Sequence, residues 1–396
     1  QAISMVESQA PAMLEVHARL MDKLSHEGRL DRKIECLPNY EEVEERKVRG
    51  EGLFRPELAV VFAYSKLLLK DLMSNSFIVK DSAFKQDLLD YFPSNLSRQF
   101  AVPIEQHRLR DEIIVNQLVN SLVNRLGPSF AFKMRDETGA SIDRVVKNYK
   151  VACNIFNVEV IWADIEGLDN KVSPAVQITM LMGVRKLIER AMYWLQRNRS
   201  QVDSIEQIIS EFADGVSTIG ADIVNCASQA DKKYVTQRIT AYKGANVGAQ
   251  LAEKIVCLEF EFMALDIIAV HTAVKQKKDD VLPVYSLVSE VLKLSWLNGC
   301  INRLPRKNYW QSLARSALRE DLHAENRALL TAIFQRSNKK DTAAKRVSDW
   351  CANNRIEIDR YLHLLSVIQA EGDIEIEQLS VILKELHAIV EKSKLK

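Results

Sequence analysis

The sequence predicts an all-α protein, a multi-helix bundle of one or two sub-bundles without a Rossmann sheet. Apolar residues recur at the three- and four-residue spacing of a helix face through most of the 396 residues. The chain has only 13 glycines and 9 prolines, so tight turns are rare. No G-x-G-x-x-G motif occurs, and the nearest pattern, Gly244 to Gly248, follows helical sequence rather than a strand. We therefore expect long helices and no dinucleotide binding by the usual route.

The most distinctive helix is expected to begin just after Gly52. Pro56 falls in its first turn, where a missing N–H costs nothing, and Glu57 places a carboxylate at the positive end of the helix dipole. Seven apolar residues follow, from Leu58 to Tyr64, a run that is too short to cross a bilayer and is typical of a helix buried in protein. Phe54 precedes this helix and has no side-chain acceptor, so the cap has to come from another residue.

Start signals mark the helices that follow. Ser141 can cap a helix whose apolar face runs from Ile142 to Phe156, and Ser173 is a cap followed by proline at the first helical position. Residues 203–206, Asp-Ser-Ile-Glu, have the pattern of a capping box. Residues 158–162 alone look locally like a strand, and their isolation favours a helix. Helical stripes are Val176, Met180, Val184, Leu187, Ala191 and Leu195; then Leu251, Ile255, Leu258, Phe262, Leu265 and Ala269, expected to form one packing face; and finally Leu379, Ile382, Leu386 and Ile389.

Breaks in the helical pattern suggest the domain organisation. They fall at residues 50–52, 127–128, 170–174 and 275–283. We expect residues 1–50 to form an arm and a solvated, charged connector, residues 51–172 a first helical sub-bundle, and residues 173–396 a second. Residue 1 is Gln and an amphipathic pattern begins at once, without a leader, which indicates a piece of a longer polypeptide.

Composition excludes several classes of partner. The 54 basic and 53 acidic residues give a net charge of +1, which argues against nucleic-acid binding. No apolar run approaches the ~20 residues of a membrane helix, so no membrane partner is expected. The six cysteines lie far apart, without a CxxC motif or histidines at zinc spacing, and this favours reduced thiols in the cytoplasm.

Candidate catalytic and metal-ligating residues are weak, and we expect none in this chain. Glu320 and His323 have the Glu-x-x-His spacing of a di-iron bundle, but such a site needs the motif twice. Asp279 and Asp280 lack a second acid at a magnesium-clamping spacing, so a surface turn is favoured. The seven histidines form no H-E-x-x-H motif and pair with no plausible nucleophile.

Two polar groups stand out as an interdomain or structural seam. Asn116, Asn120 and Asn124 recur every four residues and share one helix face, next to Arg125. Because Asn is a poor helix former, the row is either a solvent-exposed stripe or a seam that hydrogen-bonds another helix or domain. The second group is His107 with Arg108 and Arg110, close to Asp111 and Glu112; we expect an ion-pair network that fixes helix order rather than a catalytic group.

Blocks along the whole chain resemble one family. Residues 52–66, GLFRPELAVVFAYSK, closely resemble the opening of the C-terminal region of the large bacterial NAD-specific glutamate dehydrogenases. One departure is Phe54, where that family usually has threonine. The other resembling blocks are Gln1 to Ser4, His17 to Leu20, Gly28 to Arg32, Tyr91 to Pro93, His107 to Ile114, Asn120 to Gly127, Glu137 to Gly139, Trp162, Leu168 to Val172, Leu304-Pro305, Trp310, Ala314-Arg315 and Ala317 to Leu322.

The resemblance implies an enzyme whose catalytic domain lies upstream. The full enzyme would convert L-glutamate and NAD to 2-oxoglutarate, ammonia and NADH in amino-acid catabolism, as a homo-oligomer. This chain would bind no cofactor, be inactive alone, and serve its own upstream catalytic domain by scaffolding, oligomerisation or regulation. The alternatives are a helical protein-interaction adaptor unrelated to catalysis and a stand-alone all-α metal or diphosphate enzyme.

Overall fold

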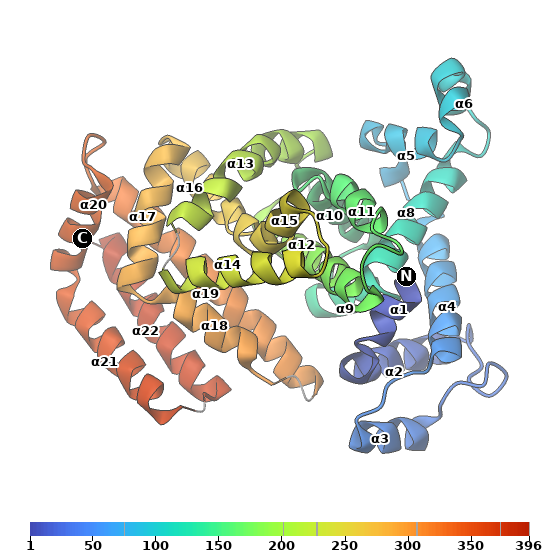
Figure 1. The fold of residues 1–396 in the computed structure, drawn as a ribbon, viewed down its shortest axis with the longest axis horizontal. Coiled ribbons are helices and arrows are strands. Elements are labelled where there is room, and N and C mark those ends of the chain that lie inside the picture. The colour runs from blue at the N-terminus through green and yellow to red at the C-terminus, as the bar shows by residue number, and fades with distance from the viewer. Residues whose placement is uncertain (75, 201, 227–228, 306–307, 373, 396) are drawn as a thin grey trace. The chain divides into compact units, whose positions relative to one another are not determined.

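The computed structural model describes residues 1–74, 76–200, 202–226, 229–305, 308–372 and 374–395 (Figure 1). Every regular element in these ranges is helical, which confirms the all-α prediction. The chain divides into two compact units, Gln1–Glu211 and Phe212–Lys396. The division into parts 1–50, 51–172 and 173–396 stays a prediction.

The first unit is built from helices α1 to α12 and the start of α13. Their bounds are α1 Ala2–Glu7, α2 Ala10–His26, α3 Tyr40–Arg49, α4 Arg55–Met73, the 3-10 turns η1 Ile78–Lys80 and η2 Ser82–Phe84, α5 Lys85–Asp90, α6 Ser94–Gln99, α7 Ala101–Glu105, α8 Arg110–Leu126, α9 Phe130–Thr138, α10 Ile142–Ile155, α11 Val158–Glu166, α12 Pro174–Asn198 and α13 Ile205–Cys226. Residues 158–162 lie in α11, so the preference for a helix there is confirmed. Residues 40–49, expected in a connector, form the charged helix α3.

The second unit continues from α13. Its helices are α14 Gln229–Gly244, α15 Ala249–Glu261, α16 Ala264–Val274, α17 Lys278–Val291, α18 Leu294–Arg303, α19 Tyr309–Arg336, α20 Ala343–Asn353, α21 Arg355–Glu371 and α22 Ile376–Leu395. The long helix α19 packs against α16, α18 and α22. The predicted stripe of α22, from Leu379 to Ile389, is fully buried, as a core face requires.

Helix starts largely follow the sequence signals. The Ser141 and Ser173 hydroxyls accept the backbone N–H groups of Arg144 and Val176, at 3.2 and 3.4 Å, which confirms both caps. The capping box predicted at residues 203–206 lies one residue later: Ser204 and Gln207 exchange hydrogen bonds of 3.0 and 3.1 Å.

Two predictions in the second unit are wrong. The apolar face expected to continue from Leu251 to Ala269 is split between α15 and α16, because a turn at Phe262 and Met263 interrupts the helix. The break expected to extend to Pro283 is shorter, since α17 begins at Lys278 and holds Pro283 inside it. Asp279 and Asp280 therefore lie in the first turn of a helix rather than in a surface turn, where their charges complement the helix dipole.

The core of the first unit forms around α10 and α12, which pack against each other, and around α4 and α8. Trp194 on α12 is completely buried. Arg144 on α10 donates hydrogen bonds to the backbone carbonyls of Leu195 and Ser200, at 3.3 and 2.6 Å. Because the last carbonyls of a helix have no partner within it, this arginine stabilises the C-terminal end of α12.

Candidate functional site

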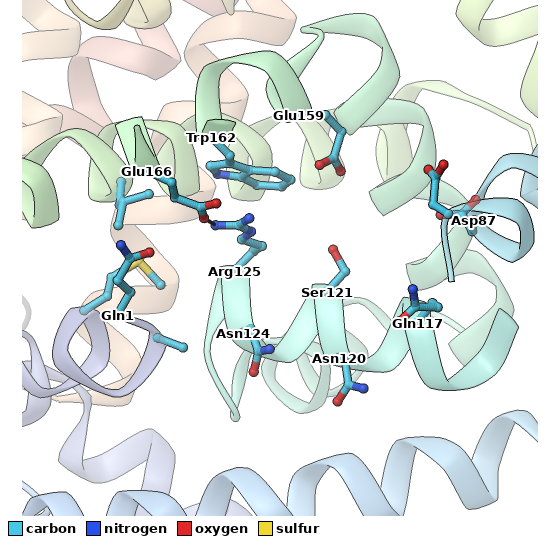
Figure 2. Close-up of a pocket in the computed structure, with 14 residues that line it drawn as sticks. Gln1, Asp87, Gln117, Asn120, Ser121, Asn124, Arg125, Glu159, Trp162 and Glu166 are labelled. Atoms are coloured by element: carbon cyan, nitrogen blue, oxygen red, sulfur yellow. Dashed lines mark hydrogen bonds and ion pairs between the residues drawn. The ribbon is translucent and has the colours of Figure 1, made fainter. Parts of the chain in front are cut away.

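A cavity of about 470 Å³ lies in the first unit, among α1, α5, α8, α11 and α12 (Figure 2). Most of its lining is polar. The lining residues are Gln1, Ala2, Met5, Asp87, Asp90, Gln117, Asn120, Ser121, Asn124, Arg125, Glu159, Trp162, Glu166 and Leu181. Its polar side chains come mainly from α8 and α11, which makes these two helices the ones that shape the site.

Two rows of polar side chains on helix α8 face solvent and the cavity. The asparagine row, Asn116, Asn120 and Asn124, is half-buried, and apolar residues such as Leu118 and Leu122 anchor the helix in the core. A second row one position ahead, Gln117, Ser121 and Arg125, lies about 100° further round the helix. Both rows contribute to the cavity lining.

Arg125 is held between two residues of α11. Its Nη1 donates to Glu166 Oε1 at 2.5 Å, and its guanidinium lies 4.3 Å from the ring centroid of Trp162. Trp162 is only 2% exposed, so its indole ring is held in place and the planar guanidinium packs against it. This arrangement fixes the direction in which the guanidinium can donate.

Glu159 lies one turn from Trp162, and in Figure 2 its carboxyl faces Ser121 across the cavity. Although the side chain keeps contact with solvent, crowding by the protein raises the pKa of the Glu159 carboxyl above its usual value. The charges of Arg125 and Lys150 oppose this increase. No hydrogen bond or ion pair to the Glu159 carboxyl is found among the residues that the structure describes.

The remaining polar lining is partly committed to bonds within the unit. Asp87 on α5 pairs with Lys150 at 2.5 Å. The Ser121 hydroxyl lies 2.7 Å from the Tyr149 hydroxyl. In contrast, the amides of Asn116, Asn120 and Asn124 have no hydrogen-bond partner among the residues that the structure describes. That the asparagine row binds another helix or domain stays a prediction.

The predicted group of His107, Arg108 and Arg110 lies at the start of α8 and does not line the cavity. Arg110 pairs with Asp111 at 2.7 Å and donates to the Val79 carbonyl at 3.0 Å. His107 Nδ1 accepts the backbone N–H of Leu109 at 3.1 Å, and Arg108 is exposed. These contacts hold the connection into α8 in place.

The Glu-x-x-His pair of α19 lies in a buried polar cluster of the second unit. His323 Nδ1 is 2.9 Å from Asp266 Oδ2, and Arg327 pairs with the other oxygen of Asp266. Asp266 is completely buried, so these two partners offset the penalty of removing its charge from water. Across the described ranges, no set of three or more His, Cys, Asp or Glu side chains has an arrangement suited to a metal.

A second cavity, of about 430 Å³, lies in the second unit between α19, α20 and α22. Its buried arginine, Arg346, already donates to the backbone carbonyls of Lys339 and Asp341, at 3.0 Å each. The first cavity is therefore the better candidate. Among the described helices, none combines the length and the apolar character needed to span a bilayer.

The described helices define an all-α protein of two compact units, with a polar cavity in the first unit. The sequence matches the family described as "Glutamate dehydrogenase, C-terminal" over residues 50–388. This match covers most of the chain, and the chain therefore belongs to that family. The resemblance recognised in the sequence blocks is confirmed.

Full-length relatives carry the same region. The chain is 29% identical over 393 residues to the NAD-specific glutamate dehydrogenase of Pseudomonas aeruginosa. It is 27% identical to the enzymes of the same name from Halomonas elongata, over 393 residues, and Mycobacterium tuberculosis, over 384 residues. These alignments cover 97% to 99% of this chain but only 24% of each relative. The chain thus spans about a quarter of the length of the relatives it matches.

Proposed function

We propose that this chain is the non-catalytic helical C-terminal region of an NAD-specific glutamate dehydrogenase. The observation that carries the proposal is the alignment of 99% of the chain with 24% of an enzyme of that name. The all-helical fold supports it, because a dinucleotide is usually held at the ends of parallel strands. Hydride transfer from L-glutamate to NAD, giving 2-oxoglutarate and ammonia, then belongs to the rest of the polypeptide, in the cytoplasm.

The asparagine row on α8 is the surface that we assign to the contact with the catalytic part. Three half-buried amides, spaced one turn apart, offer donors and acceptors in a straight line. An amide that is removed from water without a partner is destabilising, so a polar surface that pairs with this row is favoured over an apolar one. Arg125, fixed by Glu166 and Trp162, lies next to the row and gives the contact a positive charge at one end.

The test is made in the full-length enzyme, where Asn120 and Asn124 are changed together to Ala. We expect lower glutamate turnover and a lower unfolding temperature of the assembled enzyme, because the contact loses its hydrogen bonds. The matched control changes Gln237 and Gln250, two exposed amides of the second unit, to Ala and is expected to change neither quantity. Unchanged stability and unchanged assembly in the asparagine variant would rule out the interdomain role.

A further inference from the structure

The cavity next to α11 is lined by the fixed guanidinium of Arg125 and by the carboxylate of Glu159. Arg125 has five N–H donors in a planar fork, and Glu166 takes one of them at 2.5 Å. The Trp162 ring, 4.3 Å away, holds the plane of the fork (Figure 2). The fork therefore has capacity to bind a further carboxylate through charge-assisted hydrogen bonds.

Glu159 supplies the opposite charge on the same helix as Trp162. No donor to its carboxyl is found within the described part of the chain, and Asp90 adds a second negative charge to the lining. An ammonium group bound here would form an ion pair with the Glu159 carboxylate, which has no donor of its own among the described residues. Arg125 on α8 and Glu159 on α11 line the same cavity (Figure 2).

The remaining lining suits a ligand that has both kinds of charge. Gln117, Asn120 and Asn124 can each donate and accept, so they can complete the hydrogen bonds of a carboxylate or an ammonium. The cavity volume of about 470 Å³ far exceeds the ~10–15 Å³ that one water needs on the same measure, which leaves room for a molecule of several heavy atoms.

We propose that this cavity binds a free α-amino acid as a zwitterion, with its carboxylate on Arg125 and the amides of α8 and its ammonium on Glu159. The proposal that an amino acid binds depends only on the cavity and not on the proposed function. A consequence for regulation rests on the proposed function: Asn120 and Asn124 belong both to this lining and to the row assigned to the catalytic part. An amino acid in the cavity would then compete for, or order, the amides that make the interdomain contact.

The experiment is calorimetric titration of the 396-residue chain with L-alanine, L-lysine and L-glutamate. Propylammonium and propionate serve as probes that carry only one of the two charges. We expect at least one amino acid to bind with one site per chain and at least about tenfold more tightly than either single-charge probe, since each probe lacks one charged partner. Either probe binding as tightly as every amino acid would overturn the zwitterion proposal, and so would the absence of saturable amino-acid binding.

Two variants on α11 locate the site. Glu159→Gln keeps the shape of the side chain and is expected to weaken binding at least about tenfold, because the ammonium loses its charged partner. Asp164→Asn removes a carboxylate from the same helix at an exposed position outside the lining, and is expected to leave affinity unchanged. Equal affinity of the two variants would contradict the assignment. Binding in the isolated chain does not depend on the interdomain contact, so the two proposals fail separately.

Discussion

Arg46 on α3 donates two hydrogen bonds to Glu57 on α4, from Nη1 to Oε2 at 2.7 Å and from Nη2 to Oε1 at 2.8 Å. Glu57 in turn accepts the backbone N–H of Phe54 at 2.7 Å, and the guanidinium of Arg46 lies 4.4 Å from the Phe54 ring centroid. Phe54 has no side-chain acceptor of its own. The start of α4 is therefore capped by the Glu57 carboxylate, which α3 holds in position.

Replacing Arg46 by Ala is expected to lower the free energy of unfolding by about 2 kcal/mol, because a bidentate and largely buried pair is broken. Urea unfolding followed by circular dichroism measures this change. Arg49→Ala is the control, since Arg49 forms only exposed pairs with Glu45 and Glu51, worth less than about 1 kcal/mol. Equal losses in the two variants would refute the capping role of Arg46.

His17 predicts a pH dependence of stability. The ring is fully buried, neither nitrogen has a hydrogen-bond partner among the described residues, and burial, aided by the charge of Arg185, lowers its pKa from 6.5 to about 3. Between these values the unfolded chain binds a proton that the folded chain does not, so stability falls as the pH falls below 6.5. At pH 5 the expected loss from this residue is about 2 kcal/mol.

Unfolding free energies measured between pH 7.5 and pH 5 test this expectation. His17→Leu should flatten the pH profile by about the same 2 kcal/mol, because the titrating group is removed. His26→Gln, at the exposed end of the same helix, should leave the slope unchanged. If the His17 variant keeps the slope of the parent, another group carries the acid sensitivity.

Two glycines are expected to respond to alanine in opposite directions. A Cβ atom at Gly52 would lie 2.3 Å from the carbonyl carbon of Ala10, so backbone must move, and Gly52→Ala should destabilise by about 2 kcal/mol or more. Gly183 lies inside α12 with open space where a Cβ would be, so Gly183→Ala should stabilise by about 1 kcal/mol through helix propensity. Thermal unfolding of both variants checks the signs; destabilisation by Gly183→Ala would contradict this packing.

Local signals in the sequence are sufficient for the helix starts that they mark. Ser141 and Ser173 cap the helices they were expected to cap, since a serine ahead of an apolar stripe acts within its own turn. The turn at Phe262 and Met263 is not predictable from the sequence, because the apolar spacing continues through it and periodicity alone does not reveal a change of direction. A proline favours a break, but Pro283 lies inside α17, which accommodates it.

The cavity was only partly predictable. The four-residue spacing pointed to Asn120, Asn124 and, beside them, Arg125 on one helix. Gln117, Ser121 and Arg125 have the same spacing, and this is the signal in the sequence for the second polar row of the cavity. Glu159 and Glu166 could not be assigned, because their proximity to α8 depends on how α11 packs, and no local pattern encodes that packing.

The most direct test of the proposed function is the rate of NADH formation from L-glutamate and NAD. It is measured with this 396-residue chain alone and with the full-length polypeptide at equal molar concentration. We expect turnover only in the full-length polypeptide, because hydride transfer is assigned to the part outside these helices. Glutamate-dependent NADH formation by the 396-residue chain alone would contradict that assignment.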